Sequence, residues 1–191
     1  MIPHFLHDMS LDSAMATYCA NVGDYIIASN HSEHVVDLVG VGVSCFVTDT
    51  QGQTEDAEQK FFEVENLSHV DFALLQLDHG MLPNNISKCD CAIVSEGECS
   101  FVEFKANATS LNTKTIRGNY RKAMRQLSAT IKLFHDELSR IGKDFDAIRN
   151  IDSYICFKRG YPRHTASEAN YRLTFFNENH VNLSFAPKKI L

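Results

Sequence analysis

The chain has 191 residues, of which 44% are hydrophobic and 22% are charged, and its formal net charge is −6 at pH 7. These values are those of a globular protein with a single domain over residues 1–191, and they exclude a disordered or fibrous chain. No apolar run approaches the roughly 18 residues that span a bilayer, so we expect no membrane-spanning helix.

The N-terminus, MIPHFLHDMSLD, lacks the basic flank and the apolar stretch of a signal peptide. We therefore expect the protein in the reducing cytoplasm, with its six cysteines as free thiols. A zinc site is not expected, because Cys89, Cys91 and Cys99 lack a fourth ligand at normal spacing.

Charge is distributed unevenly along the chain. Residues 1–100 hold 16 acidic residues and two basic ones, whereas residues 101–191 hold 16 basic and 8 acidic residues. Between Lys105 and Lys132 there are seven basic residues and no acidic one. A basic surface of this kind can hold a phosphate backbone. Charge alone favours the simpler explanation, a solvated basic helix that balances the acidic half.

The N-terminal part, about residues 1–69, is predicted to be a β-rich extension. β-Branched apolar runs predict strands within Asp24–Ser29 and Val35–Val47, with a turn at residues 30–32. The segment Glu33–Val39 also fits the start of a short helix.

The next segments are less regular. Thr48–Glu58 is polar and is predicted to be a loop, and Gln59–Leu67 fits either a strand or a helix. Val70–Leu77 fits a short buried strand or a helical turn, and chain breakers follow it at residues 79–80 and 83–85.

A hairpin and a long helix form the clearest part of the pattern. Lys88–Val94 and Ser100–Lys105 are predicted strands, joined by a turn at residues 95–98. A helix is predicted from about Asn119 to Ile141, with Gly142 placed to end it. Its apolar positions are spaced as in a core-packing stripe: Met124, Leu127, Ile131, Phe134, Leu138 and Ile141.

The C-terminal segments predict three more strands. One is Ile151–Phe157, and the other two, Tyr171–Phe176 and Val181–Phe185, are expected to form a hairpin across residues 177–180. The order of elements predicts an α/β fold with a central mixed β-sheet and flanking helices.

Side chains in strands alternate between the two faces of a sheet. This alternation predicts that Asp90 lies on one face of its strand and that Cys89 and Cys91 lie on the other. Glu103 and Lys105 share a face of the second strand, and the register across the turn can bring Asp90 beside Glu103.

Two carboxylates and an ammonium in an apolar sheet are costly unless they are paired or bind a metal ion. A divalent cation such as Mg²⁺ or Mn²⁺ would relieve the repulsion between Asp90 and Glu103 and would make a bound water easier to ionise. Lys105 would then orient the water or stabilise phosphate oxygens. The alternative is a surface hairpin on which Glu103 and Lys105 form an exposed pair.

The wider pattern resembles the PD-(D/E)XK superfamily of nucleases, which has a restriction-endonuclease-like core. The residues that carry the resemblance are Cys89-Asp90, the strand Phe101-Val102-Glu103-Phe104-Lys105, and Ala123–Leu127 in the next helix. The resemblance covers roughly residues 70–135 and implies a nuclease-like core over about residues 70–158.

The resemblance also implies roles for individual residues. Asp90 and Glu103 would bind Mg²⁺ or Mn²⁺, Lys105 would assist the attacking water, and Gln126 would lie near the site. Asp78 would be an accessory metal-binding carboxylate. The sequence departs from the family in two ways: Cys89 stands in place of the motif's proline, and no single residue matches the glutamate expected on an upstream helix.

Basic residues follow directly after this strand. Three arginines are spaced at i, i+4 and i+8, so they lie on one flank of the predicted helix, and a further basic loop begins at Lys158. The residues predicted to contact nucleic-acid phosphates are Lys114, Arg117, Arg121, Lys122, Arg125 and Arg159.

These patterns predict a bacterial or phage metal-dependent nuclease, and the resemblance favours DNA over RNA as substrate. The alternative is a catalytically silent nuclease-like fold that serves as a binding or regulatory subunit, for example in a defence or toxin system. The acidic N-terminal half motivates this alternative, because it would suit a basic protein partner. A homodimer is also left open.

Overall fold

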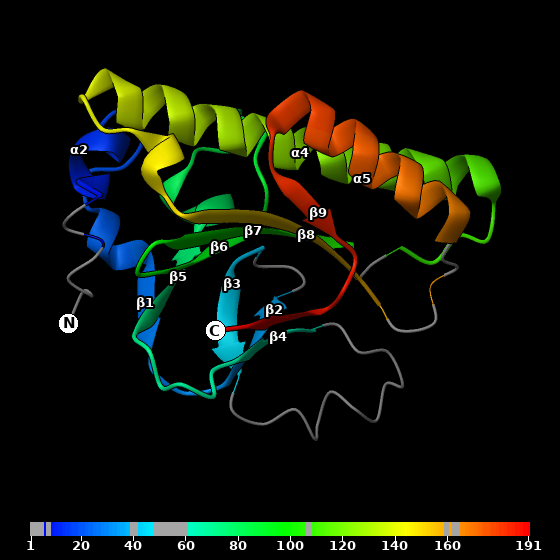
Figure 1. Ribbon diagram of the computed structural model, residues 1–191, viewed down its shortest axis with the longest axis horizontal. Helices are drawn as coiled ribbons and strands as arrows, with labels where there is room; N and C mark the ends of the chain where they lie inside the picture. The colour runs from blue at the N-terminus through cyan, green and yellow to red at the C-terminus, as the bar shows by residue number, and fades with distance from the viewer. Residues whose placement is uncertain are drawn as a thin grey trace.

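The structure is a computed structural model that describes residues 6, 9–38, 42–47, 61–105, 108–158, 161 and 165–191. Its main elements form three layers: two long helices, a six-stranded sheet, and a four-stranded sheet on the opposite face (Figure 1). The predicted mixed α/β fold with a central mixed sheet and flanking helices is confirmed. Within the described part of the chain, no helix combines the length and the apolar character needed to cross a bilayer.

The six-stranded sheet has antiparallel and parallel halves. The first four strands pair antiparallel, whereas β7, β8 and β9 pair parallel. Parallel neighbours need a long crossover, and here α4 (Thr113–Arg140) and α5 (Thr165–Asn179) supply one each. The strands in spatial order are β1 (Ile26–Ser29), β5 (Phe72–Gln76), β6 (Cys91–Ser95), β7 (Glu98–Lys105), β8 (Asn150–Phe157) and β9 (Asn182–Ser184).

The four-stranded sheet combines N-terminal strands with the C-terminus. The segment Gln59–Leu67, for which strand and helix were both expected, contains a strand. The loop predicted at Thr48–Glu58 lies outside the described residues. The strands in spatial order are β10 (Lys188–Ile190), β4 (Phe61–Glu65), β2 (Glu33–Asp37) and β3 (Ser44–Val47).

The other helical segments of the described residues are short: α2 (Leu11–Met15), η1 (Val22–Tyr25), η2 (Leu77–Met81) and η3 (Phe145–Ala147). The region of α2 is tied to the end of α4 by the Arg140 guanidinium, whose Nη2 donates to the carbonyl of Ala14 at 3.0 Å. Tyr18 adds a hydrogen bond of 2.8 Å to Glu137 on α4.

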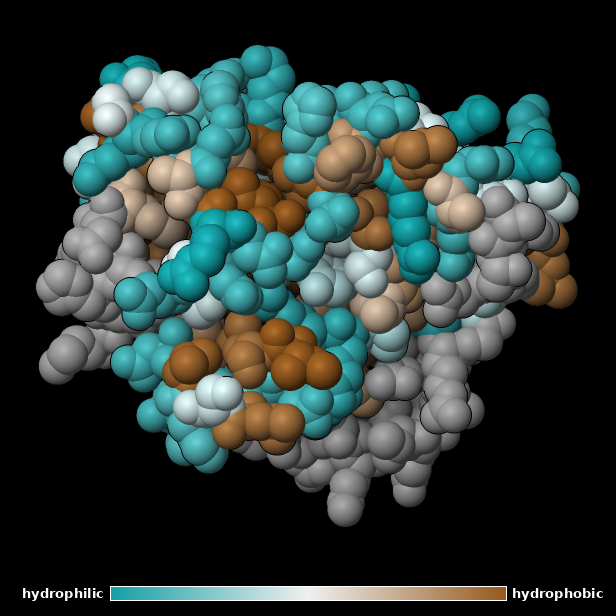
Figure 2. Space-filling view, viewed as in Figure 1, coloured by the Kyte–Doolittle hydropathy of each residue, from teal (hydrophilic) through white to brown (hydrophobic). Residues whose placement is uncertain are grey.

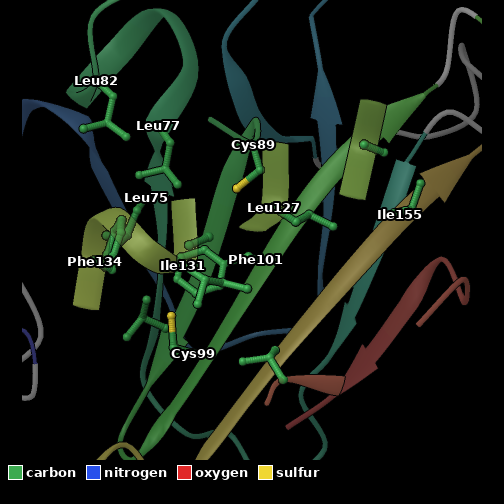
Figure 3. Close-up of a cluster of buried hydrophobic side chains, with 14 of the residues drawn as sticks. Leu75, Leu77, Leu82, Cys89, Cys99, Phe101, Leu127, Ile131, Phe134 and Ile155 are labelled. Carbon is green, nitrogen blue, oxygen red and sulfur yellow. The ribbon is translucent and has the colours of Figure 1, made fainter. Parts of the chain in front are cut away.

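Two hydrophobic cores lie on the two faces of the six-stranded sheet. The first lies under α4 and contains the predicted stripe, whose members are buried except for Ile141, which is partly buried. Figure 3 shows part of this core, with Leu127 and Phe134 of α4 beside Phe101 of β7. The second core joins the two sheets and includes Phe62 and Phe104. Both faces of the central strands are therefore apolar.

The helix α4 begins six residues earlier than predicted. Its N-cap is Asn112, whose side-chain oxygen accepts hydrogen bonds from the backbone N–H groups of Lys114 and Thr115 at 2.9 and 3.3 Å. The first turns are polar, so they carry little of the apolar periodicity that marks the rest. The predicted end is confirmed: Gly142 has φ +75°, and its N–H donates to Ser139 at 3.0 Å.

The predicted hairpin of Tyr171–Phe176 and Val181–Phe185 is wrong. Tyr171–Phe176 belongs to α5, and only Asn182–Ser184 forms a strand, which pairs with β8. The aromatic and β-branched content of the first segment favoured a strand locally. The tertiary structure instead buries Glu168 and Phe175, seven residues apart on one helical face.

The helix α5 lies in the outer layer, and part of its exposed surface is apolar. The surface over the helices is mostly hydrophilic in Figure 2, with a hydrophobic patch over α5, where Leu173 and Phe176 are exposed.

We expect the core under α4 to dominate stability. Phe134 is fully buried and its ring centroid lies 5.2 Å from that of Phe101, so Phe134→Ala should lower the free energy of unfolding by about 3–5 kcal/mol. Urea denaturation followed by circular dichroism measures this. Leu111→Ala is the control, because Leu111 is 79% exposed, and its effect should stay within about 0.5 kcal/mol. Equal effects of the two substitutions would contradict the assignment of this core.

Candidate active site

The β6–β7 hairpin brings the predicted acids together. Its register pairs Cys91 with Val102, and the same register extended by one residue sets Asp90 opposite Glu103. The Asp90 Oδ2 atom accepts a hydrogen bond of 2.5 Å from the backbone N–H of Phe104, which fixes its carboxylate against β7. The expectation that the register brings Asp90 beside Glu103 is therefore met.

The backbone is irregular where Asp90 enters the sheet. The N–H groups of Leu77 and Asp78 both donate to the Asp90 carbonyl, at 3.2 and 3.1 Å, so two residues face one as in a β-bulge. The alternation of side chains breaks here. Cys89 packs in the core under α4, and its N–H donates to Thr130 at 2.8 Å, whereas Cys91 packs between the sheets. The prediction that these two cysteines share a face is therefore wrong.

Glu103 and Lys105 are held in a chain of polar contacts. Glu103 is 1% exposed, and its Oε1 atom pairs with the Lys105 ammonium. Lys105 Nζ also donates to Gln126 Oε1 at 3.2 Å, and Gln126 Nε2 donates to the Lys88 carbonyl at 3.0 Å. The structure thus brings Gln126 of α4 to the site, as the resemblance implied, and it does not support the alternative of an exposed Glu103–Lys105 pair.

Asp78 lies at the edge of the same cluster. Its Oδ1 atom pairs with the buried Lys88 ammonium at 2.9 Å, and Lys88 also donates to the Pro83 carbonyl at 2.9 Å. The neighbouring His79 has φ +48°, a left-handed conformation that is uncommon outside glycine, and its Nε2 atom is 3.8 Å from Asp78. Asp78 is therefore already neutralised by Lys88.

Burial and neighbouring carboxylates raise the pKa values of Asp90 and Glu103. Burial raises the pKa of Asp90 to about 7, and the charges of Asp37 and Asp78 add to this, while the Phe104 N–H and Lys105 oppose it. Burial, together with the charge of Asp90, raises the pKa of Glu103 well above its usual range, against the effect of Lys105. Two acids with raised pKa values, side by side in an apolar sheet, make this cluster the candidate functional site.

Asp37 is an acid of this cluster that the sequence pattern did not identify. It is the last residue of β2, in the other sheet, and burial raises its pKa, followed by the negative charge of Asp78. Its Oδ1 atom is buried and has no hydrogen-bond partner among the described residues. No local motif surrounds Asp37 in the sequence, since only the packing of the two sheets brings it here.

The donor atoms fit a hard divalent cation such as Mg²⁺ or Mn²⁺. Asp90 and Glu103 offer carboxylate oxygens, and Glu103 Oε2 is buried without a hydrogen-bond partner in the part of the chain described. No group of three or more His, Cys, Asp or Glu among the described residues is arranged to bind a metal directly. Two carboxylates are enough for Mg²⁺, which keeps several of its waters.

The predicted phosphate-binding residues of α4 are exposed and have no ion-pair partner within the described residues. The cations of the last turns differ, because Lys132 pairs with Asp136 at 2.8 Å and Arg140 pairs with Glu137 at 2.6 Å. The α4 cations without an ion-pair partner among the described residues, called the unpaired cations below, are Lys114, Arg117, Arg121, Lys122 and Arg125.

These cations do not all face the acidic cluster. Arg121 and Arg125 line a groove between α4 and α5, together with Tyr171. Lys122 lies four residues before Gln126 and so on the same flank of the helix as the site. Arg159, the remaining predicted contact, lies outside the described residues.

Comparison with known proteins adds no relative. No protein-family model, no curated protein and no solved structure matches this chain significantly.

The raised pKa of Asp90 predicts a specific dependence of stability on pH in the absence of metal. The folded protein holds the Asp90 proton more tightly than the unfolded chain, so the free energy of unfolding should fall as pH rises from 3.8 to about 7. At about pH 8, Asp90→Asn removes the buried charge and should therefore raise the free energy of unfolding by about 1–3 kcal/mol.

Denaturation in EDTA at several pH values measures this effect. The gain should shrink towards about pH 4, where Asp90 is largely protonated in the folded state and close to half protonated in the unfolded chain. Asp136→Asn is the control, because Asp136 is exposed and the hydrogen bond from Lys132 lowers its pKa, so no gain is expected. An Asp90→Asn variant no more stable than wild type at high pH would refute the burial of a charge at this position.

Proposed function

We propose that the protein is a metal-dependent nuclease that hydrolyses phosphodiester bonds, with DNA as the favoured substrate. The observation that carries the proposal is the pairing of Asp90 with Glu103 next to Lys105, in a sheet whose two faces are apolar. Glu103 keeps one buried oxygen without a partner among the described residues. A catalytically silent subunit has no comparable need for two facing acids with raised pKa values.

The residues of the chain have distinct roles in this proposal. Asp90 and Glu103 would hold Mg²⁺ or Mn²⁺, which when bound would offset charge on the phosphate and make water easier to ionise. Asp90 is positioned for this by the Phe104 N–H.

Lys105 is held by two acceptors, Glu103 and Gln126. An ammonium has three N–H donors, so one remains for a water or a phosphate oxygen. Lys105 would therefore orient the attacking water or stabilise the phosphate, and Gln126 is a positioning residue that fixes the ammonium between α4 and β7.

The unpaired cations of α4 support a polyanionic substrate. Exposed lysines and arginines that have no acidic partner can neutralise phosphates and release counterions. Lys122, on the same flank of α4 as Gln126, would hold a nucleic-acid backbone next to the acidic cluster, and Arg121 and Arg125 would contact the backbone further along, at the groove between α4 and α5.

Cleavage of plasmid DNA and of oligonucleotides with Mg²⁺ or Mn²⁺ tests the function. Asp90→Ala, Glu103→Gln and Lys105→Ala should each lower the cleavage rate at least about 100-fold, because each removes a charged group next to the reacting phosphate. Lys132→Ala is the matched control, since this lysine is on α4 but already pairs with Asp136, and it should cleave like wild type.

Equal nicking by wild type and the three site variants would refute the assignment. Cleavage of RNA but not DNA would correct the substrate class. Binding of nucleic acid or protein by wild type, with no cleavage and no metal uptake, would favour a silent binding subunit instead.

The role of the α4 cations is tested separately by binding. In an Asp90→Ala background, the affinity for a DNA duplex is measured by fluorescence anisotropy over a range of salt concentrations. The triple variant of Arg117, Arg121 and Arg125 to alanine should reduce the slope of log affinity against log salt by about 1 for each phosphate that these arginines neutralise. Lys132→Ala with Arg140→Ala, which removes two paired cations, should leave the slope close to that of the background.

A further inference from the structure

Asp37 reaches the site through a connection between the two sheets. It pairs across the β2–β3 hairpin with Ser44, whose carbonyl accepts a hydrogen bond of 2.7 Å from Gln76 Nε2. Gln76 is the last residue of β5 and directly precedes Leu77 and Asp78, which donate to the Asp90 carbonyl. The end of β2 is thus tied to the strand end that carries the bulge.

The turn after Asp37 makes a second connection. The Gly42 N–H donates to the Leu38 carbonyl at 2.8 Å, and Gly42 has φ +71°. The ring of His79 lies so close to Gly42 that a side chain at that position would overlap it. His79 is the neighbour of Asp78, so this turn rests on the edge of the acidic cluster.

The cluster contains more carboxylates than ammonium groups. Asp78 pairs with Lys88 and Glu103 pairs with Lys105, whereas neither Asp37 nor Asp90 has an ion-pair partner among the described residues. When all are ionised, four carboxylates face two ammonium groups, which leaves two negative charges. The members are Asp37, Asp78, Asp90, Glu103, Lys88 and Lys105.

The four carboxylates differ in the ionic and hydrogen-bond partners that they have. Asp78 is paired with Lys88, and Asp90 accepts a backbone N–H. Asp37 Oδ1 and Glu103 Oε2 are buried and have no hydrogen-bond partner in the described residues. Buried carboxylate oxygens without a donor are costly, so each of these two atoms favours a proton, a water or a cation beside it, and a hydrated cation would serve both atoms at once.

We propose that Asp37 is a third carboxylate of the divalent-cation site and that it accepts hydrogen bonds from water bound to the cation. This inference rests on the proposed metal-dependent function. Direct contact with the ion is left to Asp90 and Glu103, in agreement with the absence of a three-ligand group among the described residues. The four-stranded sheet is then part of the site, because it delivers Asp37 to the hairpin that carries the other two acids.

Titration calorimetry with Mn²⁺ alone tests the inference without relying on cleavage. Loss of a carboxylate that orients metal-bound water typically weakens metal binding about 10-fold to 100-fold, so Asp37→Asn should raise the Kd for Mn²⁺ by that amount. Asp90→Asn should weaken Mn²⁺ binding at least as much. Asp71→Asn is the control, since Asp71 is an exposed acid outside the cluster, and it should bind Mn²⁺ like wild type.

The variants also need a check on folding. Thermal melts in EDTA show whether Asp37→Asn is folded, and Asp37→Ser, a second replacement without a carboxylate, must weaken Mn²⁺ binding as well. Mn²⁺ binding by both Asp37 variants at the wild-type Kd, with loss of binding in Asp90→Asn, would overturn the role of Asp37 and leave the proposed function standing. Failure of the wild-type protein to bind Mn²⁺ would overturn both.

Discussion

The register of the β6–β7 hairpin is the constraint on which the candidate site depends. Gly97, with φ +75°, allows the tight turn that pairs Ser95 with Glu98, and this pairing sets Asp90 opposite Glu103. Because side chains alternate along a strand, a slip of one residue would turn Glu103 to the other face. Such a slip would also move the apolar residues of both strands away from the cores that they fill, so the hydrophobic packing itself protects the geometry of the acids.

The same packing withdraws the acids from water. Helices cover one face of the central strands and a second sheet covers the other, so Glu103 is withdrawn from water while its neighbours are carboxylates. A charge in this position costs several kcal/mol unless a partner offsets it. Lys105 offsets part of the charge and is itself held by Gln126. Burial and the neighbouring carboxylates raise the pKa of Asp90 and so favour its protonated form, and a divalent cation, where the proposed function holds, would favour the ionised form instead.

The parts of this structure that could be predicted from sequence are those fixed by local periodicity. The strand that carries Glu103 and Lys105 and the buried stripe of α4 follow from patterns of two and of three to four residues. The strand predicted at Tyr171–Phe176 is wrong because burial of one helical face outweighs the local preference of these residues for a strand. Cys89 lies on the opposite face from Cys91 because of a bulge, which leaves no periodic signal in the sequence. The place of Asp37 in the cluster depends on how the two sheets pack, which no local pattern encodes.

The acidic and basic halves of the sequence supply different parts of the fold. Three of the four clustered acids come from the acid-rich half of the sequence, and the unpaired cations come from the helix that packs over β7. A polyanion that approached the acids alone would be repelled, since their charge has the same sign as its phosphates. A divalent cation at Asp90 and Glu103 would neutralise this charge locally, and the α4 cations would attract the flanking phosphates over a longer range. The separation of charge along the sequence therefore becomes, in space, an acidic cluster next to a helix that carries exposed cations, and this arrangement suits the proposed action on phosphodiesters.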